Sequence, residues 1–139
     1  MHAVVVIALE TALRRSELLR VSWDHIDMER GYLTVPQSKT GKARTIPLTP
    51  LAQRTLEEQA QRCHGDTVFK LSVEGFASAW RRAVIEAGIK DLTFHDLRHE
   101  AISRLFEKGL SAAQVASISG HHDTRMLARY THIEVKALL

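Results

Sequence analysis

The chain has 139 residues, which suits one compact domain that buries its own core. Hydrophobic residues make up 45% and charged residues 25%, values typical of a globular protein and not of a disordered or membrane-spanning one. Lys and Arg number 19 against 16 Asp and Glu, and this net charge of +3 suits phosphate partners without establishing nucleic-acid binding by itself.

The first predicted element is the apolar run at residues 3–9, AVVVIAL, which periodicity alone leaves open between a strand and a buried helix. The run is too short to cross a bilayer and lacks the basic flank of a signal peptide, so no membrane attachment is expected. Ser16 is predicted to cap a short helix that begins at Glu17. The single cysteine, Cys63, excludes an internal disulfide and fits a reducing, cytoplasmic setting.

Two short strand-like runs, at 32–35 and 45–48, flank the polar linker QSKTGKAR and predict a β hairpin. Thr49 and Pro50 then provide an N-cap and a first-turn proline for the next helix. The fold class is therefore mainly α with a small antiparallel β hairpin or sheet (α+β), in one domain over residues 1–139. Helices are expected over 51–62, 73–87, 95–108, the segment between Ser111 and Gly120, and around 126–130.

The helix from residue 95 opens with the stretch HDLRH. Plotted at about 100° per residue, its core-facing side is apolar in the later turns but begins with His95, Arg98 and His99. Leu97 is the one apolar residue on the opposite, polar side. Arginine is rarely fully buried unless it is paired, so this arrangement predicts a site where the helix starts. The alternative is that Arg98 pairs with a carboxylate and both histidines bond to backbone groups.

The same stretch is close to the H-E-x-x-H pattern of zinc-binding helices, because His95 and His99 lie four residues apart. Asp96, however, is one methylene shorter than the glutamate that serves there as general base. Arg98 would also place a fixed positive charge beside the metal, and a third ligand would have to come from residues 121–123. A phosphate is therefore expected at this site, and no metal.

Three further segments join HDLRH: TALRRSEL at 11–18, SKTGK at 38–42 and GHHDTRMLARY at 120–130. In this order along nearly the whole chain, the four segments resemble the tyrosine recombinase family, the phage-integrase type of site-specific DNA recombinase. The offset of nine positions (130 − 121) between His121 and Tyr130 matches the family as well. The resemblance implies the catalytic-domain fold of these enzymes.

The resemblance also assigns roles to individual residues. It implies six catalytic positions that bind, protonate or attack a DNA phosphate: Arg14, Lys39, His95, Arg98, His121 and Tyr130. Two more residues are expected to support this site from behind: His99 and Glu17. Three basic residues are candidates for other contacts with DNA: Arg15, Lys42 and Arg44.

The implied chemistry explains these residue types. A tyrosine hydroxyl that attacks the scissile phosphate releases a 5′-hydroxyl and keeps the bond energy in a phosphotyrosine, so no ATP, metal or other cofactor is needed. Arg14 and Arg98 suit the non-bridging oxygens, because guanidinium forks supply charge and bidentate geometry. Lys39 suits the general acid at the leaving oxygen. His95 and His121 would add hydrogen bonds or accept the phenol proton, around one small concavity shared with the arginines.

Two features depart from the family pattern. Ala12 stands where the family usually has glycine, and the catalytic pattern begins almost at Met1, where these recombinases usually carry an N-terminal helical domain. We therefore expect the catalytic part of a longer protein of a prokaryote, phage or mobile element. That protein is expected to act as a multimer on double-stranded DNA, and the isolated chain to be monomeric. A type IB topoisomerase-like strand transferase and a catalytically silent DNA-binding relative remain the alternatives.

Overall fold

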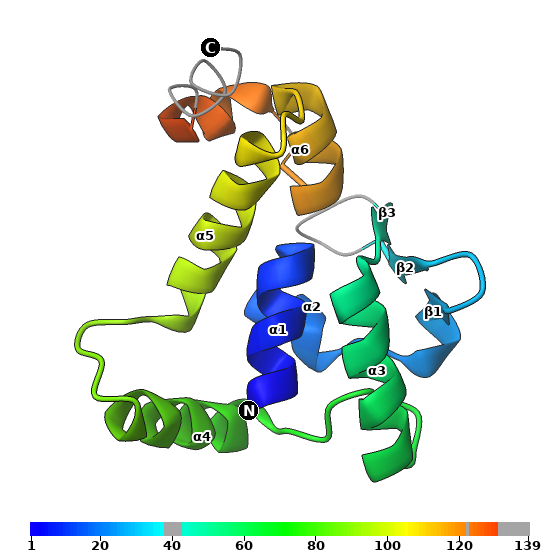
Figure 1. Ribbon diagram of the computed structural model, residues 1–139, viewed down its shortest axis with the longest axis vertical. Helices are drawn as coiled ribbons and strands as arrows, with labels where there is room; N and C mark the ends of the chain where they lie inside the picture. The colour runs from blue at the N-terminus through cyan, green and yellow to red at the C-terminus, as the bar shows by residue number, and fades with distance from the viewer. Residues whose placement is uncertain (38–42, 122, 131–139) are drawn as a thin grey trace.

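The computed structural model describes residues 1–37, 43–121 and 123–130. They form a mainly helical domain with one small antiparallel sheet (Figure 1), which confirms the predicted fold class. None of the helices in this part of the chain is long and apolar enough to cross a membrane. The elements are, in chain order, α1 His2–Thr11, α2 Arg15–Leu19, the 3-10 helix η1 Trp23–His25, β1 Ile26–Asp27, β2 Tyr32–Val35, β3 Arg44–Pro47, α3 Pro50–Arg62, α4 Val73–Glu86, α5 Phe94–Glu107, α6 Ala112–Ser119 and the 3-10 helix η2 Thr124–Tyr130.

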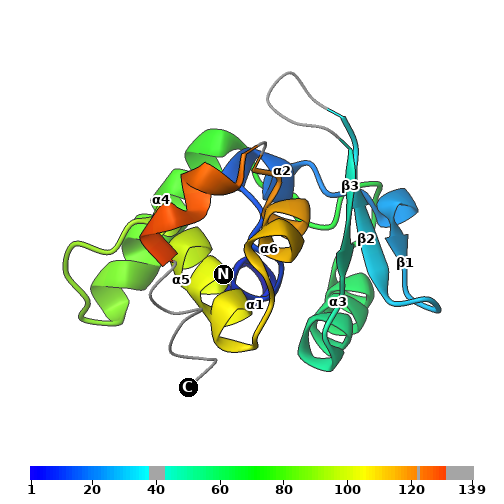
Figure 2. The same cartoon turned by 90° about the horizontal axis from the view of Figure 1, so that it is seen from above.

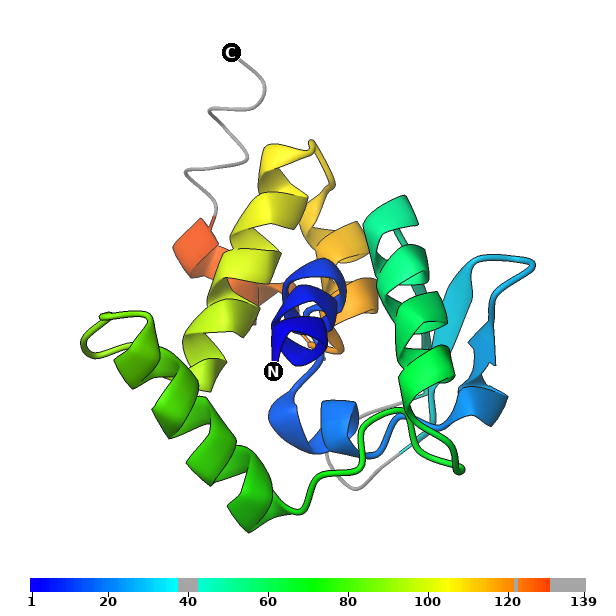
Figure 3. The ribbon, with the colours of Figure 1, turned by 60° about the horizontal axis from the view of Figure 1, so that its bottom comes forward.

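Helix α1 is the central element, with α3 on one side and α5 on the other, and Figure 3 shows it nearly end-on between them. This position resolves the ambiguity of the apolar run at residues 3–9, since a helix packed on two sides can be apolar on most of its surface. Val4, Ile7 and Ala8 are buried there. The helix ends at Ala12, whose backbone is left-handed with φ 59°. The position that is usually glycine in the family is thus one where glycine is conformationally favoured.

The sheet has the strand order β1-β2-β3 and lies beside α3 at one side of the molecule (Figure 2). Leu33 pairs with Ile46 across β2 and β3, and both side chains are buried. The predicted pairing of the two runs is confirmed, with β3 beginning one residue earlier than expected. Strand β1 was missed, because two residues are too short to show alternation.

The helix starts follow their N-caps. Thr49 Oγ1 accepts a hydrogen bond from the Ala52 N–H, and Pro50 occupies the first turn of α3, as predicted. Helix α2 differs, because it begins at Arg15 and is not capped by Ser16. Instead, Glu17 Oε1 accepts the backbone N–H of Arg14 at 2.9 Å and closes the first turn. This contact places the Glu17 carboxylate beside the start of α2.

Two apolar clusters form the core. The larger one packs α1, the sheet, α3 and the start of α5 together. The smaller one joins α5, α6 and η2, and its buried residues are Ala12, Ala101, Ile102, Phe106, Val115, Leu127 and Tyr130. The end of α1, the start of α2, the first half of α5 and the end of α6 meet between these clusters. The candidate site lies at this meeting point.

Candidate active site

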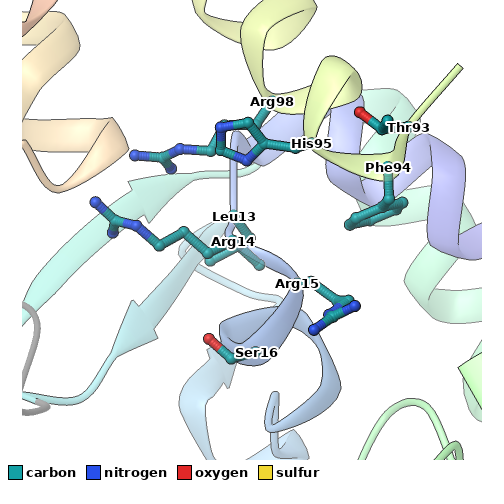
Figure 4. Close-up of a pocket in the computed structure, with 8 residues that line it drawn as sticks. All are labelled: Leu13, Arg14, Arg15, Ser16, Thr93, Phe94, His95 and Arg98. Carbon is teal, nitrogen blue, oxygen red and sulfur yellow. The ribbon is translucent and has the colours of Figure 1, made fainter. Parts of the chain in front are cut away.

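A pocket of about 410 Å³ lies between the start of α2 and the first turns of α5. Three of the predicted catalytic residues, Arg14, His95 and Arg98, line it although they come from distant parts of the sequence. In Figure 4 the guanidinium groups of Arg14 and Arg98 extend in the same direction, whereas Arg15 turns another way. The pocket therefore presents two guanidinium groups and an imidazole, a combination suited to an anion such as a phosphate.

Arg98 is fixed in the wall of this pocket. Its side chain is buried, and its two terminal nitrogens donate hydrogen bonds to the backbone oxygens of Ala12 and of Ser119, the latter at 2.8 Å. The guanidinium thus ties the end of α1 to the end of α6. Burial, and then the nearby charge of Arg14, lower the pKa of Arg98 from 12.5 to about 10, so the side chain stays charged at neutral pH. The hydrogen-bond partners of Arg98 are thus two backbone carbonyl oxygens, and not the carboxylate that the alternative interpretation anticipated.

Arg14 is held less completely. Its Nη1 lies 3.7 Å from Oε2 of Glu17, which is an ion pair without a hydrogen bond. This nitrogen is buried and has no hydrogen-bond partner among the residues that the structure describes. A buried donor without a partner costs about 1–3 kcal/mol, and an anion oxygen in the pocket would relieve that cost. Arg14 therefore retains donor capacity for a ligand.

The other residues of HDLRH each have a separate contact. His95 is exposed at the pocket, although the helical projection placed it on the core-facing side, and its ring packs edge-on to His99 at 4.6 Å. Leu97, which the projection placed outside, is buried, because the larger core reaches the first turn of α5 from that side. Asp96 accepts the N–H of Thr93 at 2.8 Å and caps the helix. Among the described residues, no group of three or more His, Cys, Asp or Glu side chains could hold a metal ion.

Tyr130 packs behind the pocket and does not line it. Its ring stacks on Phe106 at 5.8 Å, only 6% of its surface is exposed, and its hydroxyl lies 2.6 Å from Nδ1 of His99. Burial raises the pKa of Tyr130, against the opposing charges of Arg129 and Arg98. Burial and then the charge of Arg129 lower the pKa of His99. At neutral pH the phenol and the imidazole are therefore both uncharged.

His121 lies in a neighbouring cavity of about 460 Å³ between β3 and the end of α6. Its Nδ1 is 2.6 Å from Oγ of Ser119, the residue whose carbonyl oxygen accepts from Arg98. The expectation that His121 shares one concavity with Arg14, His95 and Arg98 stays a prediction. Ser119 links His121 to Arg98, and Gly120, between Ser119 and His121, ends α6 in a left-handed conformation with φ 82°.

Glu17 and Arg44 form a pair between the two cavities. Arg44 Nη1 and Nη2 donate to the two carboxylate oxygens of Glu17 at 2.7 and 2.9 Å, and Nε donates to the carbonyl oxygen of Ile118 at 2.8 Å. With 7% of its side chain exposed, Arg44 points inward, although its charge had suggested a contact with DNA. The period of two in a strand was the available signal, because it puts residue 44 on the same face as the buried Ile46.

Three candidates remain: Arg15, Lys39 and Lys42. Arg15 is exposed at the rim of the pocket, which keeps it available for a backbone phosphate. Lys39 and Lys42 lie outside the described residues. Ser119 was not anticipated from the sequence; its backbone oxygen accepts a hydrogen bond from Arg98 and its hydroxyl contacts His121. Nothing in a serine near a helix end distinguishes it from an ordinary surface residue.

Comparison with known proteins gives a consistent group of relatives. The family model described as the phage integrase family matches residues 1–136. A shufflon-specific DNA recombinase of Escherichia coli is 44% identical over 140 residues, which cover 100% of this chain and 36% of the relative. An integrase of Salmonella phage P22 is 32% identical over 152 residues, or 96% of this chain and 39% of the relative. The chain thus spans well under half the length of these relatives.

Solved structures show the same fold. The crystal structure of XerA recombinase superimposes with a TM-score of 0.83 at 22% identity, covering 99% of this chain and 55% of that chain. A lambda integrase dimer bound to a COC′ core site superimposes with a TM-score of 0.72 at 27% identity, covering 92% of this chain and 41% of that chain. The helices and the small sheet described above are therefore those of tyrosine recombinase catalytic domains.

Proposed function

Because this chain belongs to the phage integrase family, we propose that it is the DNA-cleaving domain of a site-specific recombinase. The observation that carries the proposal is the pocket in which Arg14, His95 and Arg98 converge from two distant segments. A phosphodiester has two non-bridging oxygens, and two guanidinium groups that extend in one direction suit them. The relatives named as recombinases and integrases, and the neighbour bound to a DNA core site, support a double-stranded DNA substrate.

The proposed reaction is a pair of transesterifications. The oxygen of Tyr130 forms a bond to phosphorus while the bond from phosphorus to the 5′-oxygen breaks, which leaves a 3′-phosphotyrosine and a 5′-hydroxyl. The phenol proton passes to a base, and the departing oxygen takes a proton from an acid, for which Lys39 is the candidate. In the second transesterification, a 5′-hydroxyl attacks the phosphotyrosine, the bond from phosphorus to the Tyr130 oxygen breaks, and a DNA strand is rejoined. Arg14 and Arg98 would stabilise the negative charge that grows on the phosphate oxygens.

The histidines have distinct proposed parts. His95, at the pocket, would donate a hydrogen bond to the phosphate. His99, uncharged and in contact with the Tyr130 hydroxyl, would orient the phenol from behind. His121 would reach the phosphate from the neighbouring cavity. Since the Tyr130 hydroxyl contacts His99 and Tyr130 does not line the pocket, we expect η2 to shift when DNA binds.

Binding to DNA would extend beyond the reacting phosphate. Arg15 is exposed beside the pocket and would contact the neighbouring backbone, with Lys42 as a second candidate. Exchange of strands between two duplexes requires more than one active site, so the longer protein would act as a multimer on DNA. The dimer seen for lambda integrase on its core site supports this arrangement.

A suicide substrate tests the proposal. A duplex that carries a nick next to the cleavage position loses its 5′-hydroxyl fragment after attack, which traps the covalent protein–DNA adduct. We expect an adduct that survives denaturation, and mass spectrometry should assign it to Tyr130. Relaxation of supercoiled plasmids at many sites would favour the topoisomerase-like alternative. DNA binding without any adduct, across substrates built on the target sites of the relatives, would favour the silent relative.

A further inference from the structure

Arg44 is the one predicted DNA contact whose side chain the structure turns fully inward among the described candidates. We propose that Arg44 is a positioning residue of the active site, which occupies Glu17 so that Arg14 stays free to bind the phosphate. The inference rests on the proposed function and adds a residue to it. It assigns Arg44 to the support of the catalytic arginines and not to the DNA interface.

The geometry of Glu17 is the first support. Its carboxylate accepts from Arg44 at 2.7 and 2.9 Å, from the Arg14 backbone N–H at 2.9 Å, and lies 3.7 Å from Arg14 Nη1. Arg44 therefore holds both oxygens in the short, paired geometry of a guanidinium fork, and Arg14 stands outside that geometry. Without Arg44, the nearest cation to this half-buried carboxylate would be the Arg14 guanidinium. Arg14 would then fold onto Glu17 and leave the pocket.

The balance of charge leads to the same conclusion. Arg14, Arg44 and Arg98 lie close enough for their charges to act on one another, and Glu17 is the carboxylate among them. One negative charge against three positive charges leaves two for a ligand, which matches a phosphate whose charge increases during the reaction. Loss of Arg44 would leave only one net positive charge for the ligand. The Glu17 carboxylate, without its Arg44 partner, would also repel the phosphate oxygens.

The third support is the end of α6. Arg44 Nε donates to the carbonyl oxygen of Ile118, and Arg98 donates to that of Ser119, so two arginines hold consecutive carbonyl oxygens at the negative end of the helix. The next residue, Gly120, lies so close to the Arg44 guanidinium that a Cβ added at Gly120 would stand 2.8 Å from Arg44 Nη1. Arg44 therefore fixes the segment that carries His121, as well as Glu17.

Single-turnover cleavage of the suicide substrate by the chain tests the inference. Arg44→Met keeps the length of the apolar stem but removes the fork, and misplacement of Arg14 by about 1 Å should lower the cleavage rate about 100-fold. Arg44→Lys keeps the charge and should recover only part of the rate, because one ammonium cannot hold both oxygens of Glu17. Arg104→Met, at an exposed pair with Glu100 on the same helix as Arg98, is the control and should cleave like the parent chain.

DNA binding separates positioning from a direct contact. Arg15→Met should reduce the salt dependence of affinity by the slope of about 0.9 expected for one lost phosphate contact. Arg44→Met should leave that slope unchanged while cleavage falls. A reduced slope in Arg44→Met, or an unchanged cleavage rate in Arg44→Met and Arg44→Lys, would overturn the inference. If Arg44→Met fails to fold, as judged by circular dichroism, the same two outcomes are read from Arg44→Lys.

A crystal structure provides a readout that needs no activity. In Arg44→Met, or in Arg44→Lys if the methionine variant does not fold, the Arg14 guanidinium should lie against Glu17 with short hydrogen bonds. An Arg14 that keeps its orientation toward the pocket would contradict the inference. Absence of an adduct from the parent chain, in contrast, would count against the proposed function, and the structural result would still decide the role of Arg44.

Discussion

The Tyr130 hydroxyl and Nδ1 of His99 lie 2.6 Å apart, behind the pocket that Arg14 and Arg98 line. Burial shifts the two pKa values in opposite directions, upward for the phenol and downward for the imidazole. Both shifts favour the uncharged form, so the proposed nucleophile is held as a neutral phenol in this structure. Its activation then depends on approach to the arginine charges of the pocket.

Tyr130→Phe should abolish the covalent adduct, because it removes the attacking oxygen. DNA affinity should stay nearly unchanged, since the hydroxyl faces His99 and not the exposed surface. The loss of one hydrogen bond should lower the free energy of unfolding by about 1 kcal/mol. Denaturing gels with the suicide substrate measure the adduct. Tyr32→Phe, in strand β2, is the matched control and should retain it; an adduct that persists in Tyr130→Phe would refute the assignment.

The raised pKa of Tyr130 can be measured directly, because the chain has only two tyrosines. In Tyr32→Phe, the ultraviolet absorbance of phenolate reports Tyr130 alone, and its midpoint should lie above the ordinary value of 10.0. A raised folded pKa means that the stability gained from the neutral phenol is complete below pH 10.0 and is lost as pH rises through the folded value. A midpoint at or below the ordinary value would show that the phenol is not buried as described.

Arg98→Met should destabilise the fold as well as abolish cleavage. The substitution leaves the buried backbone oxygens of Ala12 and Ser119 without their donor, and each such loss costs about 1–3 kcal/mol. Urea unfolding should therefore show a loss of about 2–6 kcal/mol. Arg104→Met, which removes an exposed arginine from the same helix, should change stability by no more than about 0.5 kcal/mol. Equal effects of the two substitutions would contradict the buried, doubly bonded state of Arg98.

The sequence predicted the helices and the paired strands because their signals are local. N-caps such as Thr49 and the period of the apolar residues are readable within one segment. The strand or helix state of residues 3–9 was not readable, since it depends on α3 and α5, which flank α1 in the fold. The same limit affected HDLRH, where a projection of one helix could not show that the larger core covers Leu97.

The candidate site was predictable to the extent that its residues match motifs. Arg14, His95 and Arg98 were named from the sequence, and the structure brings them to one pocket. The pairing of Arg44 with Glu17 was not anticipated, because 27 positions separate them and only the fold, in which β3 packs against α6, brings them together. The period of two in β3 indicates that Arg44 faces inward, but it does not identify the partner of the side chain.

Glu17 should contribute stability that is lost in acid. Burial acts to raise the pKa of Glu17, but hydrogen bonds from Arg44 and the Arg14 N–H, with the charges of both arginines, lower it below 4.5. Arg98, on α5, adds a third positive charge nearby. A lowered pKa means that this stability is present above pH 4.5 and declines as pH falls through the folded value.

Urea unfolding between about pH 3 and pH 7 measures this dependence. Glu17→Gln should be less stable than the parent chain at neutral pH and should lose less stability on acidification. Glu100→Gln, at an exposed pair, is the control and should follow the parent curve closely. If Glu17→Gln and the parent chain lose stability in parallel, the carboxylate is not held by the arginines as described.

Gly120 and Gly109 offer a matched pair for the contact with Arg44. Both have a left-handed backbone, with φ 82° and 90°, so alanine at either position should cost about 1 kcal/mol from backbone strain alone. At Gly109 nothing lies within 4 Å of an added Cβ, whereas at Gly120 the Arg44 guanidinium lies at 2.8 Å. That guanidinium has no freedom to retreat while Glu17 and the Ile118 oxygen hold it.

Gly120→Ala should therefore lose about 1 kcal/mol more of its free energy of unfolding than Gly109→Ala, through a weakened charged hydrogen bond. Introducing Arg44→Met into both variants should remove this difference, and a difference that remains would place its cause elsewhere than Arg44.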